Sequence, residues 1–147
     1  MKKFKFTLQT LLDHRENLEE QAKSHLAREM AVKRELEEIR DLLMNEVHSA
    51  KEFETVTSTE DLQNRMHRLH YASSVMREVV LKQEAIQKQK HNIELAREAL
   101  VESSQKKRVL EIHKENLKTQ WKKERKKFEI NFLDEISSQA FFKKEPS

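Results

Sequence analysis

Apolar residues in the N-terminal part of the chain recur at alternating steps of three and four, which is the spacing of a heptad coiled-coil seam. The stepped positions are Leu8, Leu11, Arg15, Leu18, Ala22, His25, Glu29, Val32, Leu36, Ile39, Leu43, Glu46, Ala50 and Phe53. Ten of these fourteen residues are apolar, and strand alternation fits the segment far worse. The spacing predicts a helix over about residues 7–55 that buries one stripe against a partner helix.

The beginning of this helix carries a signal of its own. Thr7 suits the N-cap, because its hydroxyl oxygen can accept a hydrogen bond from a backbone N–H of the first turn. Phe6 and Leu11 then occupy the two positions of a hydrophobic staple. We therefore expect Thr7 to cap the helix and Phe6 to pack on Leu11.

A second run of spaced apolar residues occupies most of the remaining chain. Its positions are Leu62, Met66, Leu69, Ala72, Met76, Val79, Ile86, Ile93, Ala96, Leu100, Leu110, Leu117, Trp121 and Phe128. The pattern weakens at Lys90 and again between Ser103 and Lys107, where a kink or a register shift stays open. The spacing predicts a second helix over about residues 59–141.

The two patterns are separated by a short polar break, Thr-Val-Thr-Ser-Thr-Glu-Asp at residues 55–61. Thr57 and Glu60 have the spacing of a capping box, which places a turn at about residues 56–58 and a helix start directly after it. Because the connection is so short, the two helices must be antiparallel neighbours.

The sequence thus predicts an all-α fold, a long two-helix antiparallel coiled-coil hairpin in a single domain, with a frayed tail at residues 142–147. At about 1.5 Å per residue the helices span roughly 75 Å and 125 Å. The second helix therefore overhangs the first over about residues 112–141. The overhang carries Leu117, Trp121, Phe128, Phe132, Leu133 and Ile136. An isolated helix gains most of its stability from packing, so this segment is predicted to bind a partner.

Composition agrees with a long helical protein and removes most enzyme classes. The 147 residues include no Gly, one Pro and no Cys, and 37% are charged. Without glycine no phosphate-binding loop can form, and a two-stranded coiled coil offers no deep pocket. His67 and His70 share a helix face but lack further ligands, so we expect no metal site and no cofactor.

No apolar run approaches the roughly 20 residues of a membrane span. The basic N-terminus resembles the start of a signal peptide, but Gln9 and Asp13 interrupt its apolar part. No cleavage site follows, so we expect the segment to be retained in a cytoplasmic protein.

A basic run lies inside the overhang, comprising Lys122, Lys123, Arg125, Lys126 and Lys127. Such runs contact acidic protein surfaces or nucleic-acid phosphates, or are simply solvated. Trp121 and Phe128 flank the run one heptad apart, which favours a coiled-coil seam over base stacking. A protein-facing or solvated role is therefore favoured over nucleic-acid binding.

The two ends of the chain together resemble the flagellar export proteins of the FliJ type. At the N-terminus the shared residues are Phe4-x-Phe6-x-Leu8-Gln9-x-Leu11-Leu12-Asp13-x-Arg15-Glu16. At the C-terminus they are Trp121, Glu124, Arg125 and Glu129, followed by Leu133-Asp134-Glu135-Ile136. The resemblance covers essentially the whole chain.

This resemblance implies a non-enzymatic stalk, similar in fold to the coiled coil of the rotary ATP synthase gamma subunit. The implied partners are a hexameric export ATPase, the cytoplasmic domain of the export gate and export chaperones. The implied location is cytoplasmic, peripheral to the inner membrane at the export gate of the type III apparatus.

The resemblance also suggests contact residues. For the ATPase they are Phe4, Phe6, Leu8, Leu11, Trp121, Phe128, Leu133, Asp134 and Glu135, with the basic run facing acidic groups that line the ring. For the export gate they are Leu69, Tyr71, Val75 and Met76. The alternative function is a generic coiled-coil scaffold, or a homodimer in which two overhangs pair with each other.

Overall fold

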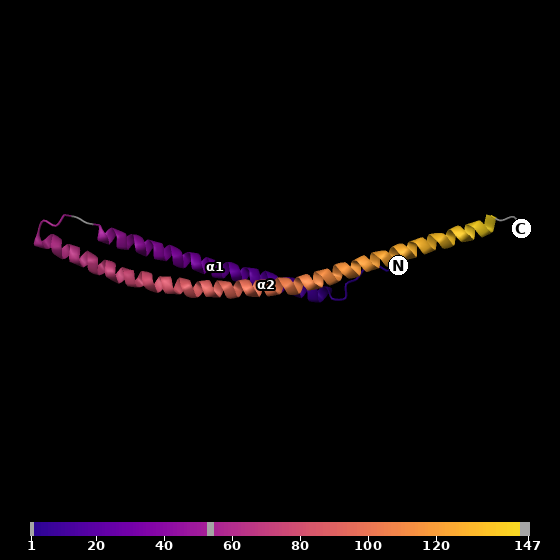
Figure 1. The fold of residues 1–147 in the computed structure, drawn as a ribbon, viewed down its shortest axis with the longest axis horizontal. Coiled ribbons are helices and arrows are strands. Elements are labelled where there is room, and N and C mark those ends of the chain that lie inside the picture. Colours follow the sequence, from indigo (N-terminus) through magenta and orange to yellow (C-terminus); the bar gives the residue numbers. More distant parts are fainter. Residues whose placement is uncertain (1, 53–54, 145–147) are drawn as a thin grey trace. The chain divides into compact units, whose positions relative to one another are not determined.

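The computed structural model describes residues 2–52 and 55–144, and it contains two helices, α1 (Gln9–Lys51) and α2 (Thr59–Lys144), which pack together as a hairpin (Figure 1). The predicted fold class is therefore confirmed. The chain divides into two compact units. We call Met1–Glu19 with Glu102–Ser147 the open-end unit, and Glu20–Val101 the turn unit.

The first helix begins later than predicted. The carbonyl of Leu8 accepts the first helical hydrogen bond, from the N–H of Leu12 at 2.9 Å, so Leu8 and not Thr7 is the N-cap. The predicted staple does not fit this start, because Thr7 and Leu12 are then the N′ and N4 residues. Leu12 is only 4% exposed and Phe6 is also buried, whereas Leu11 is 39% exposed. The helix ends at Lys51, and the predicted seam residue Phe53 lies outside the described residues.

The second helix begins with a capping box one residue after the predicted one. The Asp61 N–H donates to Ser58 Oγ at 3.2 Å, and the Thr57 N–H and hydroxyl both donate to the Asp61 carboxylate, at 3.2 and 2.7 Å. Ser58 is thus the N-cap, and Glu60 is not part of the box. The Thr57 hydroxyl bond holds the pKa of Asp61 below its ordinary value. At its other end α2 stays helical to Lys144, three residues beyond the predicted end.

Side-chain bridges in the turn unit show that the helices run antiparallel. The Gln89 side-chain amide donates to the Glu29 carbonyl at 2.7 Å and also bonds the Glu29 carboxylate. Arg40 donates to Gln83 at 3.0 Å. Arg40 lies closer to the turn than Glu29 does, and its partner Gln83 lies closer to the turn than Gln89 does. The residue numbers therefore rise on α1 as they fall on α2. Ile86 lies between the two bridges, and the other buried apolar residues of this unit lie on either side of them: Val47, Ala72, Val75, Val79, Ile93 and Ala96.

Of the two columns of residues predicted to form the seam of α1, only one packs as predicted. One predicted column, Arg15, Ala22, Glu29, Leu36, Leu43 and Ala50, does lie at least half-buried. The other column is displaced by one residue, and the packed positions are Leu12, Glu19, Leu26, Lys33, Arg40 and Val47. Val32 and Ile39 are 42% and 40% exposed beside this seam. Lys33 and Arg40 can occupy it because their aliphatic stems pack while their charged ends reach polar partners.

The seam of α2 keeps its three-four spacing without interruption. From Ala72 it continues through Gln89, Ser103 and Lys107 to Trp121, so α2 is one unbroken helix across the stretches where the apolar pattern weakens. The prediction was wrong near the turn. Four predicted seam residues there are 40–62% exposed, namely Leu62, Met66, Leu69 and Met76. Val75 takes the place predicted for Met76.

Candidate functional site

An extended segment before α1, residues 2–6, lies along α2 in the open-end unit, and we call it the N-terminal strap. Phe6 is 8% exposed, with its ring centre 5.9 Å from that of His113. The rings of Phe4 and Trp121 lie 6.0 Å apart, and the Trp121 indole N–H donates to the Lys2 carbonyl at 3.2 Å. The strap therefore continues the antiparallel course of α1 and covers α2 as far as Trp121.

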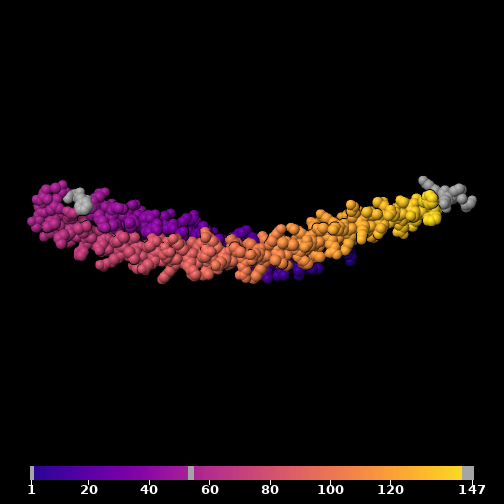
Figure 2. All heavy atoms as spheres, viewed as in Figure 1, coloured from indigo at the N-terminus to yellow at the C-terminus, as the bar shows by residue number. Residues whose placement is uncertain are grey.

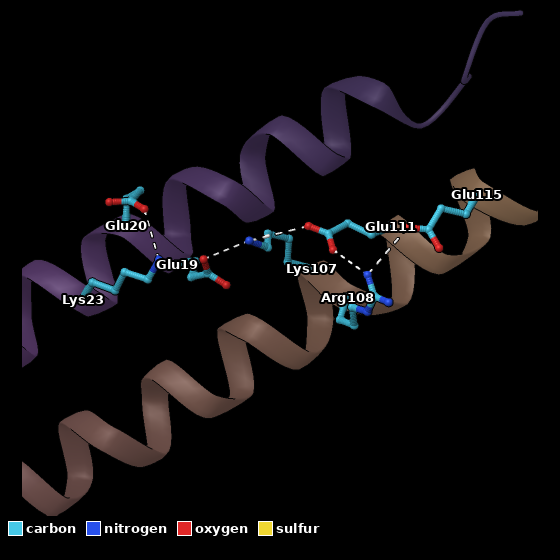
Figure 3. Close-up of polar contacts among 7 residues, drawn as sticks. All are labelled: Glu19, Glu20, Lys23, Lys107, Arg108, Glu111 and Glu115. Carbon is cyan, nitrogen blue, oxygen red and sulfur yellow. Dashed lines mark hydrogen bonds and ion pairs between the residues drawn. The ribbon is translucent and has the colours of Figure 1, made fainter. Parts of the chain in front are cut away.

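A charged network joins α1 and α2 in the open-end unit, where the seam contains Glu19 and Lys107 (Figure 3). The Lys107 ammonium donates to the Glu19 carboxylate at 2.9 Å, and the two side chains are 22% and 7% exposed. Glu111 lies 3.5 Å from Lys107 and accepts from Arg108 at 3.1 Å. The Glu19 hydrogen bond raises the pKa of Lys107. The ammonium therefore stays charged where the seam partly removes it from water.

Replacement of Glu19 by Leu is expected to lower the melting temperature by about 5 °C, because the Lys107 ammonium in the seam loses its closer carboxylate and keeps only Glu111 at 3.5 Å. The double variant Glu19→Leu/Lys107→Leu should recover that loss, since two apolar side chains then fill the same layer. Thermal unfolding followed by circular dichroism measures both. Glu20→Leu is the matched control, because Glu20 is 71% exposed beside Lys23. A double variant less stable than Glu19→Leu would contradict this account.

The part of α2 beyond the strap, residues 122–144, is the terminal segment. Every residue from 122 to 143 is exposed. In Figure 2 the indigo atoms of the N-terminal residues lie against the orange part of α2, and none covers the yellow part in that view. The large apolar side chains of the segment are 47–73% exposed, and they are Phe128, Ile130, Phe132, Leu133, Ile136, Phe141 and Phe142. This uncovered apolar helix is the candidate binding site.

The apolar side chains of the terminal segment surround the helix. Successive residues turn by roughly 100°, so Phe128, Phe132 and Ile136 share one side. Ile130 and Phe141 lie roughly opposite Phe132, and Leu133 lies between the two sides. Polar side chains lie between these apolar residues, but large apolar side chains on opposite sides of a helix cannot all be covered by one flat surface. The segment is therefore suited to a partner that encloses it.

The seam of the hairpin does not continue into this segment. Three-four steps beyond Trp121 fall on Glu124, Phe128, Asn131, Glu135 and Ser138, of which only Phe128 is apolar. A helix that followed the course of α1 would thus meet mostly polar side chains. The apolar residues instead step by four from Phe128 to Phe132 and Ile136, which turns the stripe away from the heptad course.

The basic run lies at the junction of strap and terminal segment. Arg125 pairs with Glu129 at 3.2 Å, and its guanidinium lies 5.4 Å from the Trp121 ring centre. Within residues 2–52 and 55–144, no carboxylate lies within ion-pair distance of Lys122, Lys123, Lys126 or Lys127. These four ammonium groups are available to an anionic partner.

The structure places the residues suggested for the ATPase contact in two groups. Phe4 and Trp121 lie together at the end of the strap, and the exposed Leu8 and Leu11 are the N-cap and a first-turn residue of α1. Phe6 is buried and supports the strap. The second group lies in the terminal segment and comprises Phe128, Leu133, Asp134 and Glu135. The suggested set omits Ile130, Phe141 and Phe142, because these residues fit no helical seam.

The residues suggested for the export-gate contact lie on α2 in the turn unit. Leu69, Tyr71 and Met76 are 46%, 56% and 40% exposed, whereas Val75 is buried in the seam. The Tyr71 hydroxyl donates to Glu46 at 3.1 Å, and this bond to a carboxylate raises the pKa of Tyr71. The accessible part of the suggested surface is therefore Leu69, Tyr71 and Met76.

Within residues 2–52 and 55–144, no group of three or more His, Asp or Glu side chains could hold a metal ion. No helix in that part of the chain is long and apolar enough to cross a membrane.

The fold defines the class of a two-helix coiled-coil hairpin. A model of the flagellar FliJ protein family matches residues 4–146, and the chain belongs to that family. It is therefore a non-catalytic component of the flagellar export apparatus. Comparisons with curated proteins and with solved structures found no match.

Proposed function

We propose that this chain is a stalk-like adaptor whose open end is enclosed by the hexameric export ATPase. The observation that carries the proposal is that exposed apolar side chains lie on opposite sides of the terminal segment. A flat surface or a single partner helix covers one side of a helix and leaves the opposite side in water. The central channel of a ring covers all sides at once, so it accounts for Ile130 and Phe141 as well as Phe132.

The contacts follow the order of the residues along α2. Phe4 and Trp121, with Leu8 and Leu11 nearby on α1, meet the mouth of the channel. Phe128, Leu133, Asp134 and Glu135 lie further inside it. The chain contributes no catalytic group to ATP hydrolysis, so its effect on the ATPase comes from binding energy that favours the assembled ring.

Pairing of two overhangs in a homodimer is the alternative function. A two-stranded coiled coil would need apolar residues at the heptad positions of the terminal segment. Glu124, Asn131 and Glu135 occupy three of those positions. Such a dimer would also leave the opposite apolar side uncovered, so it accounts for fewer of the exposed residues than a ring does.

The turn unit is assigned to the other partners that the family suggests, the export gate and export chaperones. The exposed residues that would meet the gate are Leu69 and Met76, which share one side of α2, and Tyr71, which lies on roughly the opposite side. Bound there, the hairpin would lie in the cytoplasm at the inner face of the membrane and connect the ATPase to the gate.

The proposal is tested with the purified chain and the export ATPase of the same organism. Mass photometry should show more hexameric ATPase when the chain is added, and steady-state ATP hydrolysis should rise with the hexamer fraction. Sedimentation of the chain alone at micromolar concentration should give a monomer. An obligate dimer, or an ATPase whose assembly and hydrolysis do not respond to the chain, would count against the proposal.

A further inference from the structure

Two groups of lysines that are distant in the sequence meet at the open end of the hairpin. The strap and residues 116–128 contain nine cationic side chains and a single carboxylate, that of Glu124. The cations are Lys2, Lys3, Lys5, Lys118, Lys122, Lys123, Arg125, Lys126 and Lys127, and we call them the basic collar. The whole chain carries a net charge of only +3, so the collar is a local excess and the rest of the chain is net acidic.

Trp121 is the residue that joins the two halves of the collar. Its indole N–H donates to the carbonyl of Lys2 at 3.2 Å, across 119 residues of sequence. Its ring lies 6.0 Å from the ring of Phe4 and 5.4 Å from the Arg125 guanidinium. The strap is extended and has no helical hydrogen bonds of its own, so these contacts fix the position of its lysines beside the basic run.

We propose that the basic collar recognises carboxylates at the mouth of the protein that encloses the terminal segment. Trp121 acts as a positioning residue, because it adds the three strap lysines to the recognition surface. The proposal rests on the proposed function, in which the enclosing protein is the export ATPase. A cluster of opposite charge at a channel mouth accelerates encounter and orients the entering helix.

The surroundings of the collar favour a protein partner over nucleic acid. Phe4 and Arg125 already lie against the Trp121 ring, so the ring is not an open platform for a base. A membrane surface is also disfavoured, because an interfacial helix carries its large apolar residues on one face, whereas Ile130 and Phe141 lie roughly opposite Phe132.

The test compares two triple variants of the full chain that lose the same charge. The strap variant carries Lys2→Ser, Lys3→Ser and Lys5→Ser, and the control carries Lys51→Ser, Lys88→Ser and Lys90→Ser in the turn unit. We expect the strap variant to associate with the ATPase about 10-fold more slowly at low salt, with the difference lost at high salt. The control should stay within about twofold of the unaltered chain.

Trp121→Phe separates positioning from packing, because it keeps a ring and removes the N–H donor. We expect about a threefold slower association and a weaker salt dependence, with unchanged helical circular dichroism. Equal association rates for the strap variant and its control would overturn the proposal that the basic collar recognises the ATPase. Failure of the unaltered chain to bind the ATPase would instead overturn the proposed function. Binding of duplex DNA or phosphatidylglycerol vesicles as tightly as the ATPase would overturn the assignment to protein carboxylates.

Discussion

Deletion of residues 122–147 is expected to weaken binding to the export ATPase by about 100-fold or more, because it removes every exposed apolar side chain of the terminal segment. The hairpin should fold without them. Its seam ends at Trp121, and no residue from 122 to 143 is buried against α1 or the strap. Affinity is measured by surface plasmon resonance, and circular dichroism should show a loss of helix confined to the deleted residues.

Single substitutions in the full chain distinguish an enclosing partner from a groove. Phe132→Ser and Ile130→Ser change residues on opposite sides of the helix that are 54% and 48% exposed. An enclosing ring contacts both sides, so both variants should bind less tightly, and neither should alter the melting temperature of the hairpin. A loss of affinity for only one of the two would indicate that the partner covers a single face. Normal binding after the deletion would remove the terminal segment from the site altogether.

The hairpin itself could be predicted because the sequence contains so few turn signals. Gly is absent and the single Pro is at position 146, so the hydroxyl-rich break near Ser58 is the one internal place where a helix start is well encoded. The apolar pattern could not show which of two neighbouring residues, Thr57 or Ser58, is the N-cap of the second helix. Thr57 with Glu60 and Ser58 with Asp61 have the same spacing and chemistry, and only the position of the turn decides between them.

The seam of α1 could not be predicted in full because its apolar face is wider than the contact. Val32 and Ile39 continue the apolar pattern, whereas Lys33 and Arg40 interrupt it, yet the structure packs the charged pair. The choice depends on the opposite helix. Arg40 meets Gln83, a partner 43 residues away that a single-helix pattern does not contain.

The open end shows a similar division between what was predicted and what was not. The overhang and its aromatic residues follow from the unequal helix lengths, and the family resemblance put Phe4 and Trp121 in the same suggested contact set. The strap is too short for any periodicity, so its contact with Trp121 has no signal in the pattern. Ile130, Phe141 and Phe142 fell outside every predicted seam because a seam describes one side of a helix, and these residues occupy the others.

Ile86→Ala is expected to lower the free energy of unfolding by about 3 kcal/mol, because Ile86 is only 1% exposed and its removal leaves a cavity between the helices. Ile39→Ala is the matched control. It makes the same chemical change in the same unit, so the gain in helix propensity cancels between the two. Ile39 is 40% exposed, and its loss should cost less than about 1 kcal/mol.

Urea unfolding followed by circular dichroism gives both values, with the slope of the transition reporting any change in the surface that unfolding exposes. The comparison bears directly on the register of the hairpin. The apolar pattern alone puts Ile39 and Ile86 in equivalent seam positions, whereas the structure fills the α1 position with Arg40, bonded to Gln83 at 3.0 Å. Equal costs for the two substitutions would therefore favour the seam predicted from the pattern. A cost concentrated at Ile86 would support the observed register, in which the charged residues of α1 pack and its apolar neighbours remain at the surface.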